Sequence, residues 1–410
     1  MRKELFTLGD LYVSDFVAEG DSPRGGKTEL KMVMDTHDST VRLEKVHPSE
    51  DMYGKYWYRS STNSTMKKEL EGIVTSVNDI LNLGKDDLWV DIACNDGTLL
   101  SYVSDELVRV GIDPVDDTYK KESEKHADLI IQDFFSYKEF SKSKYGHMKA
   151  KVVTTIAMFY DLDDPKSFMR DVRDLLDDKG VWVVQLSYTP LMLKQTAFDN
   201  ICHEHVYYYS LYNIKNMLQE CGLDVVDVAL NDVNGGSFRL YIMKSGSGKS
   251  HFGTAPYRDC CEFRVNSLLN YEKGLNLDSE KTWKKFYEDI NSLKDKIRNF
   301  ILQEKNKGKT IWGYGASTKG NTLLQYFGLD STIIDGIAER NPKKFGLKTV
   351  GTDIPIFSES DMRAANPDYL LILPWQFIKE FKLRESDYLK KGGKFIVPCP
   401  EFYIVEDKND

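Results

Sequence analysis

Short apolar runs alternate with longer amphipathic stretches through two parts of the chain. In the first part the runs lie at residues 87–93, 109–114, 127–135, 150–158 and 180–187. In the second part they lie at 309–316, 332–339, 369–375 and 393–401. Near-continuous apolar runs of this length, separated by helical stretches, are typical of parallel strands covered by helices on both faces. The pattern therefore predicts an α/β protein with two parallel sheets.

The remaining segments divide the chain. Residues 1–60 mix short apolar runs with turn signals and predict a small β-rich lobe, while 64–83 has helical spacing and a Ser or Thr cap. The Gly- and Ser-rich stretch 245–256 predicts a boundary, and the charged segment 276–306 predicts a long, solvated linker helix. We expect three domains: a lobe at 1–63, an α/β domain at 64–245 and a second α/β domain at 246–410.

Composition narrows the class of protein. The chain has 410 residues, 41% of them hydrophobic, which suffices for two or three packed cores. Its net charge is −9 and it has no basic run, so we expect no nucleic-acid partner. No stretch approaches 18 apolar residues, and the first ten residues lack the apolar core of a signal peptide. The six cysteines form no CxxC pair, which indicates reduced thiols. We expect a cytoplasmic protein, free of membrane contact, that is a monomer or weak homodimer.

A cofactor loop is predicted after the first apolar run. In "LWVDIACNDGTLLSYV", Asp91 ends a strand and is followed by a tight turn at Gly97 and then a helix. Open α/β sheets bind ligands at such strand ends. Asp113 ends the next strand and could accept both ribose hydroxyls, and Asp133 ends the third strand near Phe134, where an adenine would lie. The predicted cofactor ligands are Asp91, Ala93, Asn95, Gly97, Asp113, Asp133 and Phe134.

The loop's composition favours one nucleoside cofactor. A dinucleotide site normally has G-x-G-x-x-G, which this loop lacks. A loop with one glycine and a preceding aspartate is better suited to S-adenosylmethionine (SAM), because no pyrophosphate has to approach the backbone. Acidic residues end many strands without any function, but three at matching strand ends favour a nucleoside-type cofactor.

A cluster of polar residues, "NICHEHVYYYS", stands at 200–210. Two of the chain's seven histidines, His203 and His205, flank Glu204 there, with Cys202 before them. A histidine is suited to general base chemistry because its pKa is near neutral. A metal site is disfavoured, because adjacent side chains point to opposite faces and cannot converge on one ion. The plain structural alternative is a polar strand end bonded to backbone and water. We expect one or two of tyrosines 207–209 to lie in the core and one at the rim of the pocket.

The second α/β part begins with strand, glycine-rich turn and helix in "KTIWGYGASTKGNTLL". Gly315 permits close approach of the backbone, and Ser317, Lys319 and Asn321 stand where a helix N-terminus meets an anion. The next strand ends at Glu339, close to Asn341 and Lys343 in the sequence. A lone G-x-G could also indicate NAD. Trp375 could line a pocket, but its interpretation as a core residue is favoured.

Several motifs together carry a resemblance to a known family. "DIACNDGTLL" resembles the motif of class I SAM-dependent methyltransferases. "FDNICHEHVYYYS", "NGGSFRLYI", "GYGASTKGNTLLQYFGL" and "VPCPE" follow in an order similar to that of the sugar C-methyltransferases of deoxysugar biosynthesis. That family methylates C-3 of nucleotide-linked 4-keto-6-deoxysugars. The resemblance implies a zinc-bearing N-terminal lobe, a Rossmann-like SAM domain and a C-terminal Rossmann-like domain that holds the nucleotide sugar.

The resemblance also implies roles for individual residues. His205 falls on the family's proposed base and Glu204 on a neighbouring polar contact. Two positions depart from the family: Cys202 replaces a tyrosine and Asp161 stands near a family histidine. An active-site tyrosine of the family falls on Tyr56 or Tyr58 in "YWYRSS". The predicted catalytic residues are His205, Glu204, Cys202, Asp161, Tyr56 and Tyr58.

The nucleotide sugar has its own predicted ligands. "NGGSFR" is expected to carry a turn that faces the pocket, although its glycines have an equally good conformational explanation and Arg239 an alternative role in a salt bridge. The predicted substrate ligands are Asn234, Gly235, Ser237, Arg239, Gly315, Ser317, Lys319, Asn321, Glu339, Asn341 and Lys343.

The family's zinc lobe carries paired CxxC motifs, whereas the first cysteine here is Cys94, after the lobe. His37 and His47 cannot make a four-ligand site without thiolates nearby. We therefore expect the lobe to fold without zinc and the chain to bind no metal.

The leading hypothesis is a SAM-dependent C-methyltransferase acting on a nucleotide-linked keto-deoxysugar through an enolate. The alternatives are an O- or N-methyltransferase of a nucleotide sugar, assisted by a carboxylate such as Asp161 or Glu204, and a binding protein that has lost its chemistry. An NAD-dependent sugar oxidoreductase is weakened by the missing G-x-G-x-x-G.

Overall fold

The computed structural model describes residues 1–48, 52 and 57–407, which form two compact units. The terminal unit contains the segments 1–52, 190–206 and 277–410, and the central unit contains 53–189 and 207–276. Each unit is built from segments that are far apart in the sequence. The division into three continuous domains stays a prediction.

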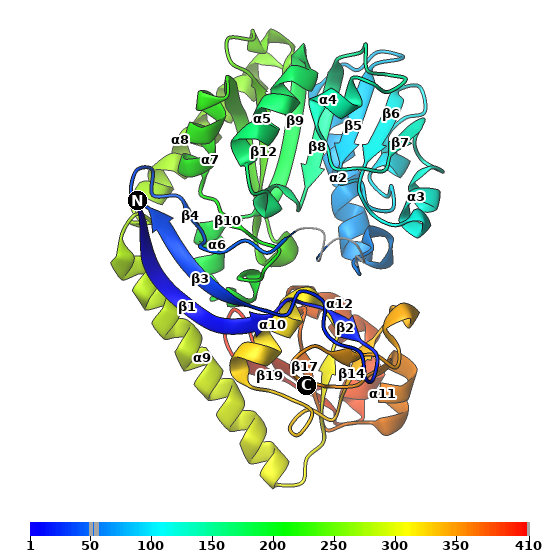
Figure 1. Cartoon of the computed structure of the whole chain (residues 1–410), viewed down its shortest axis with the longest axis vertical. Coiled ribbons are helices and arrows are strands. Elements are labelled where there is room, and N and C mark those ends of the chain that lie inside the picture. The colour runs from blue at the N-terminus through cyan, green and yellow to red at the C-terminus, as the bar shows by residue number, and fades with distance from the viewer. Residues whose placement is uncertain (49–51, 53–56, 408–410) are drawn as a thin grey trace. The chain divides into compact units, whose positions relative to one another are not determined.

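The central unit is built on a seven-stranded sheet of order β11-β12-β9-β8-β5-β6-β7 (Figure 1). β5, β6, β7, β8 and β9 are parallel, and β12 runs antiparallel to both β9 and β11. The chain leaves β5 toward β6 on one side and later returns to β8 on the other, so a topological switch point lies at the end of β5, where open sheets bind ligands. The strands are β5 (Leu88–Ile92), β6 (Val108–Ile112), β7 (Leu129–Ile131), β8 (Ala150–Ile156), β9 (Leu176–Ser187), β11 (Leu223–Asn231) and β12 (Ser237–Lys244), with the short β10 (Tyr207–Tyr208).

Helices flank this sheet. They are α2 (Ser64–Ile80), α3 (Asp117–Ser123), α4 (Tyr137–Phe140), α5 (Pro165–Leu175), α7 (Leu211–Glu220) and α8 (Ala255–Lys273). Single 3₁₀ turns are η1 (Ser60–Thr62), η2 (Leu100–Tyr102), η3 (Phe159–Asp161), η5 (Val233–Gly235) and η6 (Lys249–His251).

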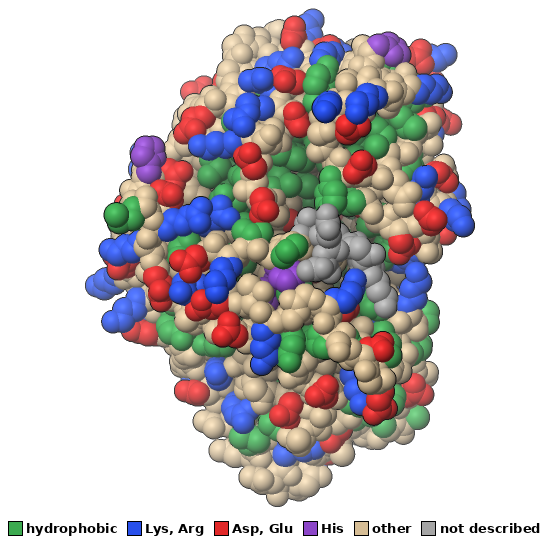
Figure 2. Space-filling view, in the orientation of Figure 1, with side chains coloured by type: hydrophobic (Ala, Val, Ile, Leu, Met, Phe, Trp, Pro, Cys, Tyr) green, Lys and Arg blue, Asp and Glu red, His purple; other side chains and the backbone are tan. Residues whose placement is uncertain are grey.

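The surface of the molecule carries both signs of charge. Lys and Arg side chains are interspersed with Asp and Glu over the face shown in Figure 2, which agrees with the absence of a basic run in the sequence. Along the described chain, none of the helices combines the length and the apolar character that a bilayer-spanning segment requires.

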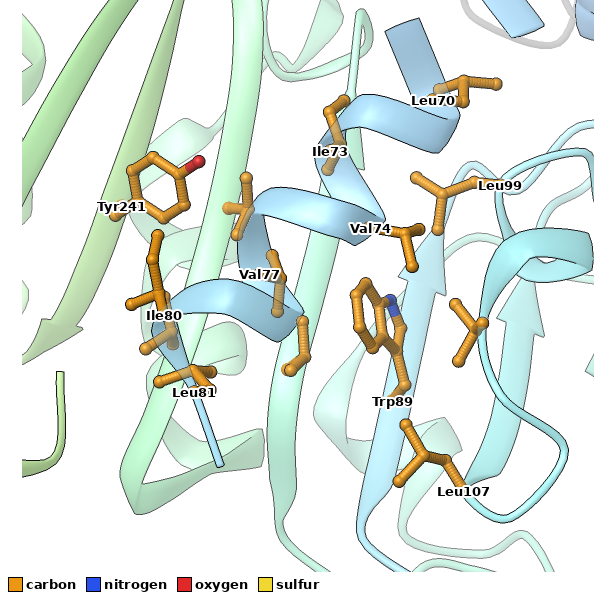
Figure 3. Packing of buried hydrophobic residues seen from close by; sticks show 14 of the residues in the cluster. Leu70, Ile73, Val74, Val77, Ile80, Leu81, Trp89, Leu99, Leu107 and Tyr241 are labelled. Carbon is orange, nitrogen blue, oxygen red and sulfur yellow. The ribbon is translucent and has the colours of Figure 1, made fainter. Parts of the chain in front are cut away.

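The core of the central unit forms where α2 packs on the sheet (Figure 3). The side chain of Asn63 caps this helix by accepting hydrogen bonds from the N–H groups of Thr65 and Met66. The apolar residues of α2 recur at helical spacing, so they share one face. That face buries Leu70, Ile73, Val74, Val77 and Ile80 against Trp89, Leu99, Leu107 and Tyr241.

The helix expected directly after Gly97 does not form. β5 is followed by turns and by η2, a single 3₁₀ turn. Only fifteen residues separate Ile92 from Val108, and the Asp96 side chain accepts hydrogen bonds from the backbone and hydroxyl of Thr98, which favour a turn. The loop after β5 therefore offers backbone groups rather than the N-terminus of a helix.

The terminal unit contains a six-stranded sheet of order β16-β14-β13-β17-β18-β19. All neighbouring strands are parallel except β18 and β19. In chain order the strands read 3-2-1-4-5-6, the order of dinucleotide-binding sheets, so the switch point lies between β13 and β17. The strands are β13 (Ile311–Tyr314), β14 (Gly336–Glu339), β16 (Ile356–Ser358), β17 (Tyr369–Ile372), β18 (Lys394–Val397) and β19 (Tyr403–Val405).

Helices also flank this sheet. They are α9 (Glu280–Asn306), α10 (Thr318–Phe327), α11 (Glu359–Ala365), α12 (Ile378–Arg384) and α13 (Ser386–Lys390), with η7 (Pro342–Lys344) and η8 (Trp375–Phe377). α6 (Thr189–Lys194) begins at the boundary between the units, and η4 (Phe198–Asn200) follows it.

The N-terminal lobe is an antiparallel arrangement of β1 (Arg2–Tyr12), β3 (Lys27–Asp35) and β4 (Val41–Leu43). β2 (Phe16–Val17) pairs with β15 (Lys348–Thr349), so the lobe is joined to the C-terminal part of the terminal unit by backbone hydrogen bonds. The α/β class, with two Rossmann-like sheets and a small N-terminal β lobe, is confirmed.

The long helix α9 is not a solvated linker. It runs beside β1 (Figure 1), where the Phe6 ring stacks on Tyr287 with centroids 5.0 Å apart. Its apolar stripe buries Trp283, Phe286, Ile290, Leu293, Ile297 and Ile301. The charged residues of the helix lie on its outer face, whereas its apolar residues, at helical spacing, pack on the core of the unit.

Candidate active site

A short turn, η4, is fixed to the switch point of the terminal sheet by three side chains. The ring of Phe198 stacks on Phe327 of α10, with centroids 4.9 Å apart. The indole nitrogen of Trp375 donates to Asp199 Oδ2 at 3.0 Å, and Lys319 Nζ donates to Asn200 Oδ1 at 2.6 Å. Trp375 follows β17 and Lys319 lies in the first turn of α10. The turn is therefore held by the segments that follow both strands of the switch point, β13 and β17.

This turn orients His205. The Nδ1 atom of His205 lies 2.9 Å from the carbonyl oxygen of Asn200, so Nδ1 carries the proton and Nε2 is the basic nitrogen. The side chain is 7% exposed. Burial, and next the charge of Lys319, lower the pKa of His205 to about 3. The imidazole is therefore neutral near pH 7 and can accept a proton.

Glu204 and His203 have different surroundings. Burial raises the pKa of Glu204 to about 7, although a hydrogen bond with Thr318 and the charge of Lys319 oppose the shift. His203 Nε2 lies 2.9 Å from Thr28 O in the N-terminal lobe. His203 and His205 thus bind separate carbonyl groups, one in the N-terminal lobe and one in η4. Cys202 is buried, and its carbonyl oxygen accepts the N–H of His205.

His203 makes stability depend on pH. Burial lowers its pKa from 6.5 to about 4, so between these values the unfolded chain binds a proton that the folded chain does not. The free energy of unfolding should therefore fall as the pH decreases through this window, by up to about 1.4 kcal/mol per pH unit for one group. The variant His203→Gln keeps an N–H donor for Thr28 but has no group that titrates in this window. We expect its free energy of unfolding, measured by urea titrations, to fall less steeply between pH 6.5 and 4.5 than that of the wild type. Equal slopes for the two proteins would contradict this prediction.

The glycine-rich turn between β13 and α10 is tightly built. Gly315 has φ +82°, and a Cβ there would lie 2.7 Å from Pro374. The Ser317 hydroxyl caps α10 by accepting the N–H of Gly320 at 3.0 Å. Asn321 Nδ2 donates to Asp15 O at 3.1 Å, which ties the N-terminal lobe to the same helix. A side chain at position 315 would displace the neighbouring strand end.

Of the two adjacent lysines, Lys344 rather than Lys343 reaches this turn. Lys344 is buried, and its Nζ donates to Ala316 O at 2.7 Å, whereas Lys343 is exposed. Glu339 Oε1 accepts the N–H groups of Arg340 and Asn341, so that carboxylate closes the turn after β14. The sequence contained the two lysines but no signal for which of them points inward.

The predicted cofactor loop of the central unit gathers buried carboxyl groups. Asp91 Oδ1 accepts the Thr154 hydroxyl at 2.6 Å, and Asp113 accepts the N–H groups of Asn95 (2.7 Å) and Val115 (3.1 Å). Burial raises the pKa of Asp91 to about 7 and that of Asp113 to about 6. Three residues of the loop have positive φ: Ala93 at 62°, Asn95 at 52° and Gly97 at 74°. The strained loop and its carboxyl groups fit a ligand that brings hydroxyl donors and positive charge.

The other predicted residues are placed as follows. Asp133 and Phe134 are exposed at the end of β7, and Tyr58 is 41% exposed before α2. Asp161 ends η3, after β8. Tyr56 lies outside the described residues. These positions leave the predicted roles of the five residues open.

The segment "NGGSFR" is held internally. Asn234 and Gly235 have φ values of 55° and 84°, as a sharp turn requires, and Ser237 Oγ donates to Val233 O. Arg239 forms an ion pair with Glu69, with 2.6 Å between Nη2 and Oε1. These contacts favour the conformational and salt-bridge explanations, and a substrate role for the segment stays a prediction.

Comparisons with known proteins agree with this geometry. A family described as "methyltransferase domain" matches residues 64–228, and one described as "C-methyltransferase C-terminal domain" matches 232–400. C-methyltransferase NovU of Streptomyces niveus is 29% identical over 407 residues, which cover 98% of this chain and 94% of NovU.

Solved structures show more distant likenesses. A SAM-dependent methyltransferase of Clostridium acetobutylicum is 14% identical, and the match covers 45% of this chain and 94% of that one at a TM-score of 0.34. The CcbJ methyltransferase of Streptomyces caelestis is 12% identical, with 46% and 94% covered at a TM-score of 0.35.

The sheet of the central unit, its loop after β5 and the matching methyltransferase family define a SAM-dependent methyltransferase. Within that class, the match of residues 232–400 to a C-methyltransferase C-terminal domain and the 29% identity to a C-methyltransferase along nearly the whole chain make the protein similar to the C-methyltransferases.

No group of three or more His, Cys, Asp or Glu side chains within residues 1–48, 52 and 57–407 is arranged to hold a metal ion. Packing and β-sheet pairing hold the N-terminal lobe, with Asp15 and Arg24 adding an ion pair at 3.0 Å. We expect prolonged dialysis against EDTA to leave the Tm unchanged in differential scanning calorimetry. A lower Tm that zinc restores would contradict a zinc-free lobe.

Proposed function

We propose that the protein methylates C-3 of a nucleotide-linked 4-keto-6-deoxysugar through an enolate, with His205 as the base. The observation that carries this proposal is the neutral His205 imidazole, oriented by the Asn200 carbonyl beside the Lys319 ammonium. A base together with a nearby cation is the combination that enolisation needs.

The reaction removes a proton from a carbon next to a ketone. His205 Nε2 takes the C-3 proton, and the electron pair moves onto the C-4 oxygen. Lys319 stabilises the negative charge on that oxygen. Bound SAM supplies an electrophilic methyl group: the carbon–carbon bond forms as the sulfur–methyl bond breaks. Asn200 holds His205 in the required tautomer, and Asp199 and Trp375 hold the turn that carries Asn200.

The low pKa of His205 makes it a weak base, so the reaction depends on Lys319. The cation that lowers the pKa of the imidazole also lowers the free energy of the enolate. An anionic substrate bound beside Lys319 would offset the cation's effect on His205 and make the imidazole more basic. The imidazole of His205 is therefore expected to become a stronger base once the anionic substrate is bound.

The glycine-rich turn is suited to the nucleoside diphosphate. Its backbone N–H groups and the N-terminus of α10 attract anions, and Gly315 allows close approach. The buried Lys344 adds positive charge below the turn. We propose that the diphosphate lies there, in contact with Ser317 and the start of α10.

Mass spectrometry tests the proposed function directly. The protein is incubated with SAM and a panel of dTDP-, GDP- and UDP-linked 4-keto-6-deoxysugars, and the product is located by NMR. We expect a gain of one methyl group on C-3. A C-4 ketone also acidifies C-5, so methylation there would keep the chemistry and reject the position. A methyl group on oxygen or nitrogen, or no transfer to any member of the panel, would reject the proposal.

A further inference from the structure

The segment Tyr58–Ser61 is fastened to the cofactor loop of the central unit. The N–H of Ser60 donates to Asn95 Oδ1 at 3.1 Å, and Asn95 Nδ2 donates to Tyr58 O at 3.1 Å. The N–H of Ser61 donates to Asp96 Oδ2 at 3.0 Å. Three hydrogen bonds therefore fix a segment that precedes α2 against the loop that follows β5.

Arg59 lies in the middle of this segment. Its guanidinium carbon is 4.7 Å from the ring centroid of Tyr119 in α3, and the two side chains are hydrogen-bonded. Its Nε is shielded from solvent and has no hydrogen-bond partner among the described residues. α3 follows β6, whose end carries Asp113. The guanidinium thus lies near β6 and α3, next to the cofactor loop, and its Nε–H is a buried donor that a ligand could satisfy.

The carboxyl groups around the cofactor loop attract only the positively charged and hydroxyl-bearing parts of SAM. Asp96 and Asp113 are 5% and 7% exposed, and their buried carboxyl groups favour the sulfonium, the ammonium and the ribose hydroxyls. The same groups repel the carboxylate at the amino-acid end of the cofactor. That carboxylate therefore needs a cation, and a guanidinium binds it with two parallel hydrogen bonds.

We infer that Arg59 binds the carboxylate of SAM and that the segment Tyr58–Ser61 forms a wall of the cofactor site. The inference rests on SAM dependence and not on the identity of the sugar, so it holds or fails independently of the proposed substrate. The inference gives the "YRSS" motif a role in cofactor binding. The family resemblance had suggested a role only for its tyrosine, in the chemistry of the sugar.

Two ligands that differ in one group test the inference. Isothermal titration calorimetry measures the Kd of S-adenosylhomocysteine and of its decarboxylated form, which keeps the amine and the nucleoside. We expect Arg59→Gln to weaken S-adenosylhomocysteine by about 10- to 100-fold and the decarboxylated ligand by less than about twofold. The wild type should prefer S-adenosylhomocysteine by a similar factor.

The control is Arg170→Gln on the exposed side of α5, which should bind both ligands as the wild type does. Arg59→Lys keeps the charge without the planar fork, so it should lose affinity for S-adenosylhomocysteine alone and by less than the Gln variant. It also keeps the test valid if Arg59→Gln does not fold. An equal loss for both ligands would show that Arg59 acts only through the segment, and unchanged affinity would show no contact; either result overturns the inference.

Discussion

Replacing His205 by asparagine should reduce methyl transfer by about 10²- to 10⁴-fold, the usual contribution of a positioned general base. Asparagine keeps a polar side chain near the Asn200 carbonyl but has no basic nitrogen. The affinity for SAM should change by less than about twofold, because the cofactor loop belongs to the other unit of the chain. Turnover of the keto sugar is measured by mass spectrometry, and SAM affinity by calorimetry.

The matched control is His37→Asn, since His37 is exposed in the N-terminal lobe and has no part in the proposed chemistry. It should keep the turnover of the wild type. A His205→Asn protein with full activity would reject the role of the imidazole. Loss of SAM affinity together with activity would instead indicate general damage to the fold.

Lys319→Met should lower kcat by about 10²- to 10³-fold, as the removal of one stabilising donor at a developing oxyanion does. We also expect the pH profile of kcat/KM to shift in a defined direction in this variant. Lys319 lowers the pKa of His205, so without the cation that pKa rises. The acid limb of the kcat/KM profile should then move to higher pH, because a more basic imidazole is protonated earlier as the pH falls.

Lys319→Arg should recover part of the turnover, since it restores the charge near Asn200. Lys382→Met, on the exposed side of α12, is the control and should behave as the wild type does. An acid limb that moves to lower pH in Lys319→Met, or unchanged turnover, would show that Lys319 does not act on the imidazole and the oxyanion as proposed.

The strands of both sheets could be predicted because their signal is local. A buried parallel strand is apolar at nearly every position, as in β17 and, apart from Asp91, in β5, and the residues of both strands are all buried. The helix expected after Gly97 failed for an equally local reason: Asp96 binds Thr98 and favours a turn. The outward charges of α9 hid its apolar stripe, although the spacing of that stripe was present in the sequence.

The candidate site could be predicted only in part because its contacts join distant segments. Lys319 is 119 positions away from its partner Asn200 in the sequence, and Trp375 is 176 positions away from Asp199. A local sequence pattern cannot predict contacts over such separations. His205 was predicted through its motif, and Trp375 is buried, as its interpretation as a core residue requires, but its contact with Asp199 was missed. The available signal was the "FDN" turn directly before the histidines, which places three anchoring side chains in a row.

Proton exchange at the carbon next to the ketone reports on the formation of the enolate itself. The enzyme and the keto sugar are mixed in deuterated water with S-adenosylhomocysteine in place of SAM, and the C-3 proton signal is followed by NMR. We expect this signal to disappear with the wild-type protein and to persist with His205→Asn. A signal that persists with the wild type, although methyl transfer occurs with SAM, would contradict the enolate and the role of His205.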